Sequence, residues 1–457
     1  MYGNHIKLSG RNFNKCRYEK YSTDLSQGAC FFIDVCNKEW TNISPIDTQQ
    51  KRQRHIERLI HPTKSNPNPK YPFDIKGSEY YKFPSYLRRA AINDAIGAVS
   101  SYRSNYTNWQ NDGKKGNAPI LQHDRHSMPV FYNKNMYKET APKNAKYPKG
   151  ISPDEENVRW LKLYKNKDWI WAPVKLRRTD INYINKYWGA CEDKSAPVLE
   201  KIHNKYYLRF SFTETVILSD TPIAKQIICA VDLGINTDAV CSIMKTDGTI
   251  LARKFIDFTS DKDRMIHAMN RTRRKQSKYG PKSTRGLWAY VKRLNEDRAK
   301  KISAAIVEFA SQQSVDAIVM EHLDFNGCKK RGSKAQRLSM WNHGIIREKV
   351  EQKSHLLGIR IATICAWKTS ALAFDGSGSV ARDDNNHALA TFTTGKQYNC
   401  DLSASYNIGA RYFIRGLLKS LPATEESRVK AKVPDAGRRT SCTLSTLRAL
   451  VKELSAA

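Results

Sequence analysis

The second half of this 457-residue chain predicts an α/β domain, and the first half predicts an α+β domain. From about residue 226 onward, short apolar runs such as IICAVDLGI alternate with long segments of helical periodicity, a pattern typical of buried strands joined by helices. The first half is instead rich in Tyr, Trp, Asn and Lys. Its segment YYLRFSF places Leu208, Phe210 and Phe212 at every second position, as in a half-buried strand.

The chain is strongly basic. It has 77 Lys and Arg residues against 44 Asp and Glu residues, a formal net charge of +33 that is spread over its whole length. Such a field attracts polyanions, of which nucleic acids are the commonest large ones. The sequence has no apolar run of about 18 residues and no N-terminal signal core, so we expect no membrane partner and a cytoplasmic location.

Within the first half we expect a helical insertion at residues 49–111. Apolar residues recur at helical spacing between Ser85 and Trp109, which would leave the charged residues of that helix facing outward. The flanking segments, 1–48 and 112–225, predict a β-barrel-like wedge domain that binds nucleic acid. The candidate contacts in the insertion are Arg88, Arg89, Tyr102 and Arg103.

The second half predicts a strand, a hairpin, a long helix, a strand, a helix, a strand and a final helix. The hairpin turns at Thr246-Asp247-Gly248, and the long helix is interrupted near Gly280-Pro281. The final helix starts around Cys400 and ends near Leu418. The remaining residues, 421–457, are polar and basic with weak periodicity and predict a flexible tail.

Three carboxylates occupy unusual places for a charge. Asp232 ends the apolar run IICAVD, Glu321 ends AIVME, and Asp401 opens the last predicted helix. Any one acid at a strand end is more often a turn former or an ion-pair partner, and Asp401 alone could be a helix cap. Together, carboxylates that converge at one sheet edge repel one another unless a cation lies between them, and hard oxygen donors favour Mg²⁺ or Mn²⁺ over zinc.

The positions of these acids in the element order are informative. They fall on the first strand, on the strand after the long helix and on the last helix, which is the arrangement of an RNase H-like nuclease core. Two metal ions about 3.5 to 4 Å apart at such a site would hold an attacking water and the leaving oxygen of a phosphodiester in line.

The segments DLGINTDAVCSIM with Asp232, VMEHLDF with Glu321 and CDLSASYNIGARYF with Asp401 resemble the three RuvC-type motifs of the TnpB transposon nucleases and their descendants, the compact type V CRISPR effectors. The resemblance covers about residues 226–418 and extends more weakly into the first half. It implies an RNA-guided DNA endonuclease with an RNase H-like (RuvC-like) domain at 226–368 and 396–420.

The same resemblance implies the site and the partners. Asp232, Glu321 and Asp401 would be the catalytic residues and the ligands of two Mg²⁺ ions, with Mn²⁺ as a substitute. The partners would be a guide RNA with a structured scaffold and a target double-stranded DNA with a short flanking motif. The location would be the prokaryotic cytoplasm, in association with the nucleoid.

One departure from this family concerns zinc. Family members carry two C-x-x-C pairs before the third acid, but here the corresponding positions hold Ala373, Gly376, Thr391 and Thr394. None of the ten cysteines forms a C-x-x-C pair, and the neighbouring Cys365 and Cys400 are out of register and without histidine partners, so they make an incomplete site. We therefore expect no zinc and a metal-free, zinc-ribbon-like hairpin at 369–395 that loads the target nucleic acid or covers the site.

Two basic clusters lie where a guide and target would need them, although either could be a solvated surface. An RNA-guided effector holds the heteroduplex by its backbone, so many cations are needed and a sequence-reading helix is not. The candidates in the long helical region and in the loop after Glu321 are Arg271, Arg273, Arg274, Lys275, Lys329, Lys330 and Arg331.

Two other functions remain open from the sequence. The first is an RNA-guided DNA-binding protein whose cleavage is weak or lost; the presence of all three acids argues against it. The second is a transposase or resolvase built on the same RNase H-like core without RNA. The sequence also leaves open whether the guide comes from a CRISPR array or from a transposon end.

Overall fold

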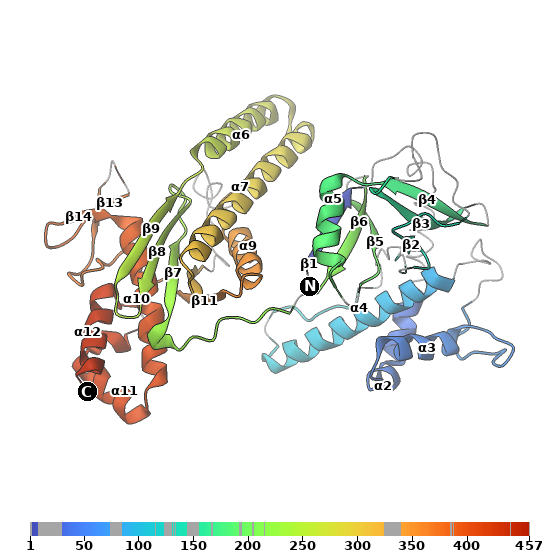
Figure 1. The fold of residues 1–457 in the computed structure, drawn as a ribbon, viewed down its shortest axis with the longest axis horizontal. Helices are drawn as coiled ribbons and strands as arrows, with labels where there is room; N and C mark the ends of the chain where they lie inside the picture. The colour runs from blue at the N-terminus through green and yellow to red at the C-terminus, as the bar shows by residue number, and fades with distance from the viewer. Residues whose placement is uncertain are drawn as a thin grey trace. The chain divides into compact units, whose positions relative to one another are not determined.

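The structure is a computed structural model. It describes residues 2–7, 30–73, 85–114, 116–122, 130, 132, 134–143, 155–165, 168–191, 194–202, 205–213, 215–323, 340–383, 386, 388–438 and 440–456. The chain forms two compact units, Met1–Glu214 and Thr215–Ala457. Figure 1 shows both, and each is described below by itself.

The first unit combines helices with two small antiparallel sheets. One sheet has the order β1-β6-β5 and the other β2-β3-β4. The strands are β1 (Tyr2–Lys7), β2 (Tyr137–Lys138), β3 (Val158–Lys165), β4 (Asp168–Lys175), β5 (Val198–Ile202) and β6 (Lys205–Phe212). The helices are α2 (Trp40–Ile43), α3 (Gln49–Ile60), α4 (Ser85–Asn111) and α5 (Arg178–Tyr183). Their apolar faces share one core, in which Trp188, Tyr137 and Phe210 pack edge to face.

Arg88 corrects one expectation about α4. We expected its side chain on the outer face, but Arg88 is only 8% exposed and lies 3.5 Å from the Glu57 carboxylate on α3. Arg89 pairs with the same carboxylate at 3.1 Å. The sequence pattern could not predict this burial because it depends on Glu57. This residue pairs with the Arg88 guanidinium across the α3–α4 contact and offsets the free-energy cost of burying it. Arg88 is therefore a structural residue of this helix pair.

Glu39, which immediately precedes α2, forms hydrogen bonds to a loop that is distant in the sequence. Its carboxylate is 4% exposed and accepts hydrogen bonds from Lys70 Nζ (2.6 Å), Tyr71 Oη (2.8 Å) and Asn42 Nδ2 (2.7 Å). The hydrogen bonds from Lys70, Asn42 and Tyr71 lower the pKa of Glu39 to about 2.

Because the Glu39 pKa is lower in the folded state than in the unfolded chain, Glu39 should stabilise the first unit above pH 4 to 5. This stabilisation should be lost as the pH falls through about 2. We expect Glu39→Gln to lower the free energy of unfolding by roughly 1–2 kcal/mol at neutral pH and to flatten this part of the acid-unfolding curve. The effect is modest because Lys70 is largely exposed, so solvent screens the ion pair. Thermal unfolding followed against pH measures it. Glu156→Gln, an exposed glutamate, is the control, and an equal effect of both variants would contradict the assignment.

The second unit is built on a five-stranded sheet of order β11-β10-β7-β8-β9. Its strands are β7 (Ile227–Asp232), β8 (Ala239–Lys245), β9 (Ile250–Ile256), β10 (Ala317–His322) and β11 (Arg360–Cys365). The pairs β7–β8 and β8–β9 are antiparallel, whereas β10 is parallel to both β7 and β11. These strands and the intervening helices follow in the order that the sequence predicted.

Helices cover both faces of this sheet (Figure 1). Alternate residues of β7 point to opposite sides, so Cys229 and Val231 pack with α7 (Arg285–Gln312) and α9 (His343–His355). Ile228 and Ala230 pack instead with α10 (Cys400–Ser420) and α12 (Leu444–Ser455). A strand that is buried on both faces needs apolar residues at every position, which is why IICAV has no alternation.

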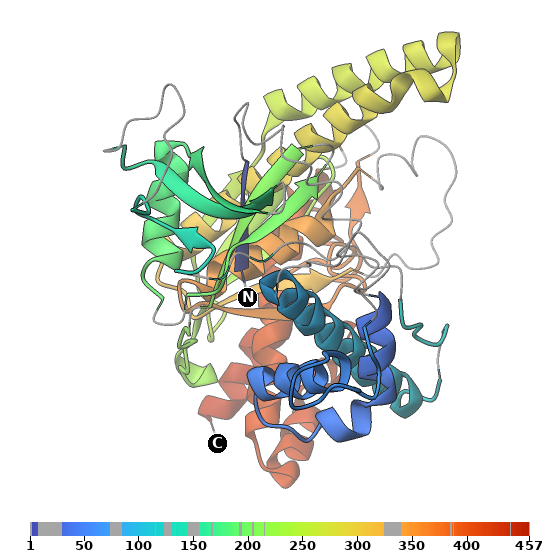
Figure 2. The same ribbon diagram turned by 90° about the vertical axis from the view of Figure 1, so that its right-hand side faces the viewer.

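The long helical region forms a helical hairpin that projects from the sheet (Figure 2). Helix α6 (Thr259–Tyr279) ends where Gly280 adopts a left-handed φ of 77°, and α7 begins after a short turn at Pro281–Thr284. The interruption expected near Gly280-Pro281 is thus a reversal of the chain. Met265, Met269 and Val291 form the small apolar contact between the two helices.

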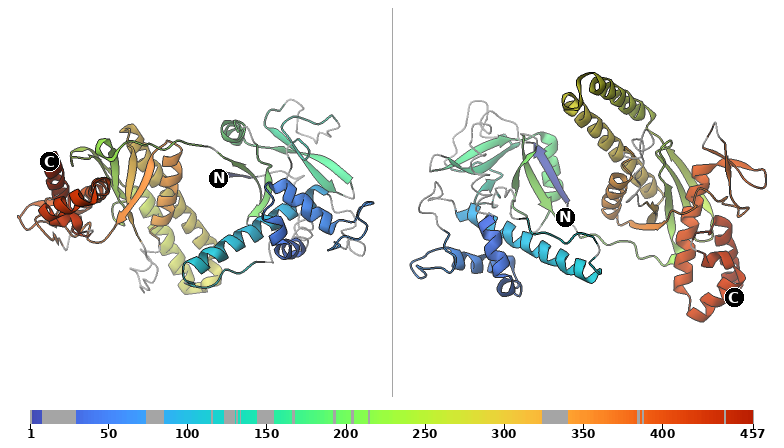
Figure 3. Two further views of the ribbon diagram at one scale, coloured as in Figure 1. Left: turned by 90° about the horizontal axis from the view of Figure 1, so that it is seen from below. Right: turned by 180° about the vertical axis from the view of Figure 1, so that it is seen from behind.

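The C-terminal segment corrects the expectation of a flexible tail. It forms α11 (Ala423–Lys432) and α12, which pack beside α10 (Figure 3). Leu444, Leu447 and Leu450 of α12 are at most 1% exposed, one helical turn apart. The stripe is only three residues long and is surrounded by Ser, Thr, Lys and Arg, so its periodicity is weak, but burial of leucines in this way is strongly stabilising.

Helix α10 approaches the sheet closely because Gly409 has no side chain. A Cβ at this position would lie 2.9 Å from the Met244 Sδ and 3.3 Å from the Ala230 Cβ. We expect Gly409→Val to lower the free energy of unfolding by about 1–3 kcal/mol through overpacking. Thermal unfolding tests this, with Gly344→Val on α9 as the matched control because a Cβ at Gly344 meets nothing within 4 Å. Similar unfolding temperatures for the two variants would show that this contact relaxes freely.

Candidate active site

Asp232 and Glu321 reach the same end of the sheet. The parallel strands β7 and β10 pair Val231 with Met320, so the next residue of each strand, Asp232 and Glu321, arrives at one edge. Asp401 is the second residue of α10, which packs on β7 and β8. The N-cap of α10 is Asn399, whose side chain accepts a hydrogen bond from the Leu402 N–H at 2.8 Å. Asp401 is therefore not used as the cap, and its carboxylate is available.

The three carboxyl groups act on one another. Burial raises the pKa of Asp232 well above its ordinary value, and the charges of Glu321 and Asp401 raise it further. Burial also raises the pKa of Glu321 and of Asp401. Three acids that are held together in a poorly solvated place disfavour their own ionisation, and a cation at the same place would reverse that effect.

A loop after β11 holds Glu321 in position. The Thr369 hydroxyl contacts Glu321 Oε1, and Thr369 itself is 3% exposed. Asn407 of α10, which is fully buried, donates to the Thr369 carbonyl oxygen at 3.0 Å and to the Leu372 carbonyl oxygen at 2.9 Å. Arg411, one turn further along α10, donates to the Trp367 carbonyl oxygen at 2.8 Å. One helix thus carries Asp401 and also fixes the loop that contacts Glu321.

A second loop, between β7 and β8, reaches Asp401. The Thr237 side chain opposes the rise in the pKa of Asp401. The turn that places Thr237 needs Gly234, since a Cβ there would overlap the Thr237 carbonyl oxygen.

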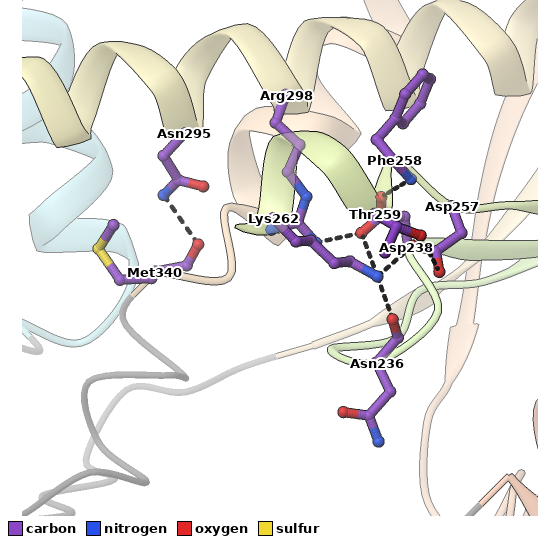
Figure 4. Close-up of polar contacts among 9 residues, drawn as sticks. All are labelled: Asn236, Asp238, Asp257, Phe258, Thr259, Lys262, Asn295, Arg298 and Met340. Atoms are coloured by element: carbon purple, nitrogen blue, oxygen red, sulfur yellow. Dashed lines mark hydrogen bonds and ion pairs between the residues drawn. The ribbon is translucent and has the colours of Figure 1, made fainter. Parts of the chain in front are cut away.

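Asp238 anchors this second loop to the base of the helical hairpin (Figure 4). Its carboxylate is 1% exposed and contacts the Arg298 guanidinium of α7, while Lys262 Nζ of α6 lies 3.4 Å away. The Phe258 N–H donates to Asp238 Oδ2 at 2.9 Å. A buried carboxylate that has two cations and a backbone donor is fully satisfied, so Asp238 is a structural anchor rather than a fourth acid of the site.

Arg382 is a functional candidate that the sequence reasoning missed. It lies on β12 (Ala381–Arg382), and its guanidinium donates to the Ser370 Oγ at 2.8 Å. Its positive charge lowers the pKa of both Asp232 and Asp401, against the effect of burial. No motif in the sequence marks it, because a single arginine among 77 cations carries no signal until the fold places it beside the acids.

Arg382 belongs to the hairpin that we expected at 369–395. Strands β12, β13 (Leu389–Thr391) and β14 (Gln397–Asn399) form a small antiparallel sheet. Ala373, Ala390, Phe392 and Cys400 form a small apolar core beneath it. Cys400 is 1% exposed, and burial raises the pKa of its thiol. An apolar cluster therefore occupies the base of the hairpin, and Cys400 is one of its packing residues.

The donor set fits a divalent cation. Three carboxylates supply hard oxygen ligands, which suit Mg²⁺ or Mn²⁺. In the part of the chain that the structure describes, no three His, Cys, Asp or Glu side chains lie close enough to form a complete ligand cluster by themselves. The three carboxylates thus influence one another's ionisation but do not by themselves form a closed set of metal ligands.

The residues predicted to contact nucleic acid differ in their surroundings. Arg271, Arg273, Arg274 and Lys275 are exposed on α6. Arg103 is exposed on α4 but donates to the Asn37 Oδ1 at 2.7 Å, and Tyr102 packs against Tyr106 with ring centroids 5.9 Å apart. Lys329, Lys330 and Arg331 lie outside the described residues. No helix among the described residues is both long and apolar enough to cross a membrane.

Comparison with known proteins gives two kinds of similarity. Residues 23–165 match the model of the Aq_aa04 family. The uncharacterized protein aq_aa04 of Aquifex aeolicus (strain VF5) is 42% identical over 120 residues, which are 23% of this chain and 60% of that protein. The chain therefore spans less than two thirds of this relative, and the residues that match the family model fall in the first unit.

Solved structures resemble the chain over most of its length. CasPhi-2 (Cas12j) bound to crRNA and phosphorothioate-DNA is 10% identical, with a TM-score of 0.53 over 90% of this chain and 91% of that one. Cas12f1 in its complex with sgRNA and target DNA is 14% identical, with a TM-score of 0.32 over 89% of this chain and 99% of that one. These structural neighbours are compact type V CRISPR effectors. At such low identity, the similarity to CasPhi-2 is one of fold.

Proposed function

We propose that this protein is an RNA-guided DNA endonuclease that hydrolyses phosphodiester bonds of target DNA after the guide RNA has paired. The observation that carries the proposal is the convergence of Asp232, Glu321 and Asp401, from two parallel strands and a helix, on one edge of the sheet. This is the placement that an RNase H-like, RuvC-like site requires.

Asp232, Glu321 and Asp401 would hold two Mg²⁺ ions, with Mn²⁺ as a substitute. When bound, such ions activate a water nucleophile and stabilise the leaving oxygen, which yields 5′-phosphate and 3′-hydroxyl ends. One of the chain's own polar groups orients a ligand: the Thr369 hydroxyl contacts the Glu321 carboxylate, and Asn407 holds Thr369 in place. Arg382 adds a positive charge that is available to a negatively charged phosphodiester.

Binding of the polymer would rest on charge and on stacking. The net charge of +33 and the exposed cations of α6 suit the backbone of an RNA–DNA heteroduplex. Trp367, in the loop that Arg411 fixes, leaves 64% of its surface exposed and offers a platform for an unstacked base. The fold similarity to CasPhi-2, whose structure contains crRNA and phosphorothioate-DNA, supports RNA and DNA as partners here.

The test uses the full chain purified with the RNA that it retains from its own genomic locus. Sequencing of that RNA should give a discrete structured scaffold followed by a guide. A plasmid that carries the matching target and its flanking motif should be cut with Mg²⁺ and remain intact with EDTA. Binding of the target without cutting would favour the DNA-binding alternative, and the absence of any discrete RNA would favour a transposase or resolvase.

A further inference from the structure

Two large aromatic side chains are exposed at the acid end of the sheet, which is the end where Asp232 and Glu321 lie. Phe255, the last residue but one of β9, is 50% exposed, and Trp367, just beyond β11, is 64% exposed. Strands β9 and β11 form the two edges of the sheet, and the strands that carry Asp232 and Glu321 lie between them. The two rings therefore flank these acids from opposite edges.

The strand register places Phe255 in the same row as Asp232. Asp232 of β7 pairs with Val240 of β8, and Val240 pairs with Phe255 of β9. Residues that lie directly opposite one another share a face of the sheet, so the Phe255 ring is on the same face as the Asp232 carboxylate. Val240 packs on this face with α10, the helix that carries Asp401. Two strand spacings, roughly 10 Å, separate the backbones of Phe255 and Asp232.

Trp367 holds the corresponding position at the other edge of the sheet. Strand β11 is parallel to β10 and pairs Ile364 with Glu321, so the chain leaves β11 at the acid end. The Trp367 carbonyl oxygen accepts a hydrogen bond from the Arg411 guanidinium at 2.8 Å. The backbone of Trp367 is thus fixed by a buried side chain of α10, whereas its indole ring remains exposed.

Each ring has an exposed cation beside it. Arg253 lies two residues before Phe255 and therefore points to the same face of β9. Lys368 directly follows Trp367. Both cations are exposed, and neither has a carboxylate partner in the described part of the chain. An aromatic ring beside an unpaired cation suits a nucleotide, because the base stacks on the ring and the phosphate accepts hydrogen bonds from the cation.

Neither ring takes part in the packing of the chain itself. Among the residues that the structure describes, Phe255 and Trp367 have no ring–ring or cation–π contact, and neither belongs to an apolar core. A single exposed apolar side chain is common on proteins and needs no explanation. Here two large rings lie at the two ends of one row of residues that contains the acids. This arrangement indicates a ligand that spans the row.

We infer that a single strand of DNA crosses the acid end of the sheet from one edge to the other, with one base stacked on Phe255, another on Trp367 and a phosphodiester between them at the three carboxylates. In a duplex both faces of each base are already stacked, so only an unpaired strand offers a base to these rings. The inference rests on the proposed nuclease function and adds the path of the strand to it. Since every base has a face that stacks, the path favours no particular sequence at the cut.

The first test is photochemical cross-linking, which needs no cleavage. The full chain with its retained RNA, carrying Asp232→Asn and kept in EDTA, is irradiated with a single-stranded oligodeoxynucleotide in which 5-iododeoxyuridine replaces thymidine. Mass spectrometry of the peptides identifies the adducts. We expect adducts on Phe255 and on Trp367, with about tenfold lower yields when the same strand is fully paired in a duplex. Adducts that miss both rings, or equal yields from the duplex, would overturn the inference.

The second test separates positioning of the strand from the chemistry. Phe255→Ala and Trp367→Ala should each raise KM for a single-stranded substrate about tenfold and change kcat by less than about threefold, as expected when only stacking is lost. Phe255→Trp should restore the native KM, because it returns a ring to the same place. Leu251→Ala is the matched control, since Leu251 is an apolar residue of β9 that is 46% exposed but lies outside the row of the acids.

Equal KM values for Phe255→Ala and Leu251→Ala would overturn the role of Phe255, and a native KM for Trp367→Ala would overturn that of Trp367. The two tests also separate this inference from the proposed function. Adducts on both rings in a chain that cleaves no DNA would contradict the nuclease function and support the path of the strand. Cleavage without either adduct would support the nuclease function and overturn the path.

Discussion

Replacing Asp232 with Asn should abolish Mg²⁺-dependent cleavage of target DNA, by at least about 10³-fold, and leave binding of the guide RNA intact. The charges of Glu321 and Asp401 both raise the pKa of Asp232, so all three carboxylates act at one place. In the proposed site the loss of Asp232 would remove a metal ligand that neither Glu321 nor Asp401 could replace. Single-turnover cleavage of a labelled target measures the effect.

Asp247→Asn is the matched control for this variant. Asp247 is also an acid next to a β-strand, but its carboxylate accepts a hydrogen bond from the Thr249 N–H at 2.8 Å and acts as a turn former. Its loss should leave cleavage unchanged. Cleavage by the Asp232→Asn protein at the native rate would falsify the assignment of the active site.

The Asp232→Asn substitution should not lower the stability of the folded chain. Asp232 is 9% exposed and lies near the like charges of Glu321 and Asp401, which Arg382 only partly offsets, so its ionised form destabilises the folded chain when no cation is bound. We therefore expect the thermal unfolding temperature of Asp232→Asn to equal or exceed that of the native chain in EDTA. A large decrease would mean that lost cleavage reflects unfolding instead of lost chemistry.

Replacing Arg382 with Ala should slow cleavage by about 10²-fold to 10³-fold at saturating Mg²⁺. Arg382 is the cation whose charge acts on both Asp232 and Asp401, and it is held by its hydrogen bond to Ser370. Without it, the hairpin would lose a cation that acts on both Asp232 and Asp401. Arg382→Lys should recover part of the rate, because it restores the charge but not the forked geometry of the guanidinium.

Lys396→Gln provides the control on the same hairpin. The Lys396 ammonium lies over the rings of Phe374 and Tyr398, at 4.9 and 5.3 Å from their centroids. Unlike Arg382, it is not a cause of the pKa shift of Asp232. Its loss should change cleavage by less than about threefold, in keeping with a cation–π contact of modest strength. Equal losses in the Arg382 and Lys396 variants would show that only the net charge of the hairpin matters.

The local sequence pattern predicted most of the strands and helices of the second unit. IICAVD and AIVME are apolar because β7 and β10 are buried on both faces, and acids at their ends therefore stood out. The reversal at Gly280 was visible because glycine and proline interrupt a helical period.

What the sequence could not supply were contacts between distant residues. Arg88 is buried because Glu57 lies across from it, and the α12 leucines are buried because α10 offers them an apolar face. Thr369, Asn407 and Arg382 surround the acids only through long-range packing. A polar residue carries the same letter whether it faces water or a carboxylate, so neither periodicity nor spacing distinguishes such positions.

Helix α10 has little freedom to change. Asp401 faces the acids, Asn407 and Arg411 hold the loop that contacts Glu321, and Gly409 touches the sheet. Sequence drift and engineering should therefore concentrate elsewhere, on the tip of the α6–α7 hairpin, where side chains are mostly exposed. Attempts to alter which nucleic acids this protein accepts have the most room there, and a library that randomises α10 should yield few folded members.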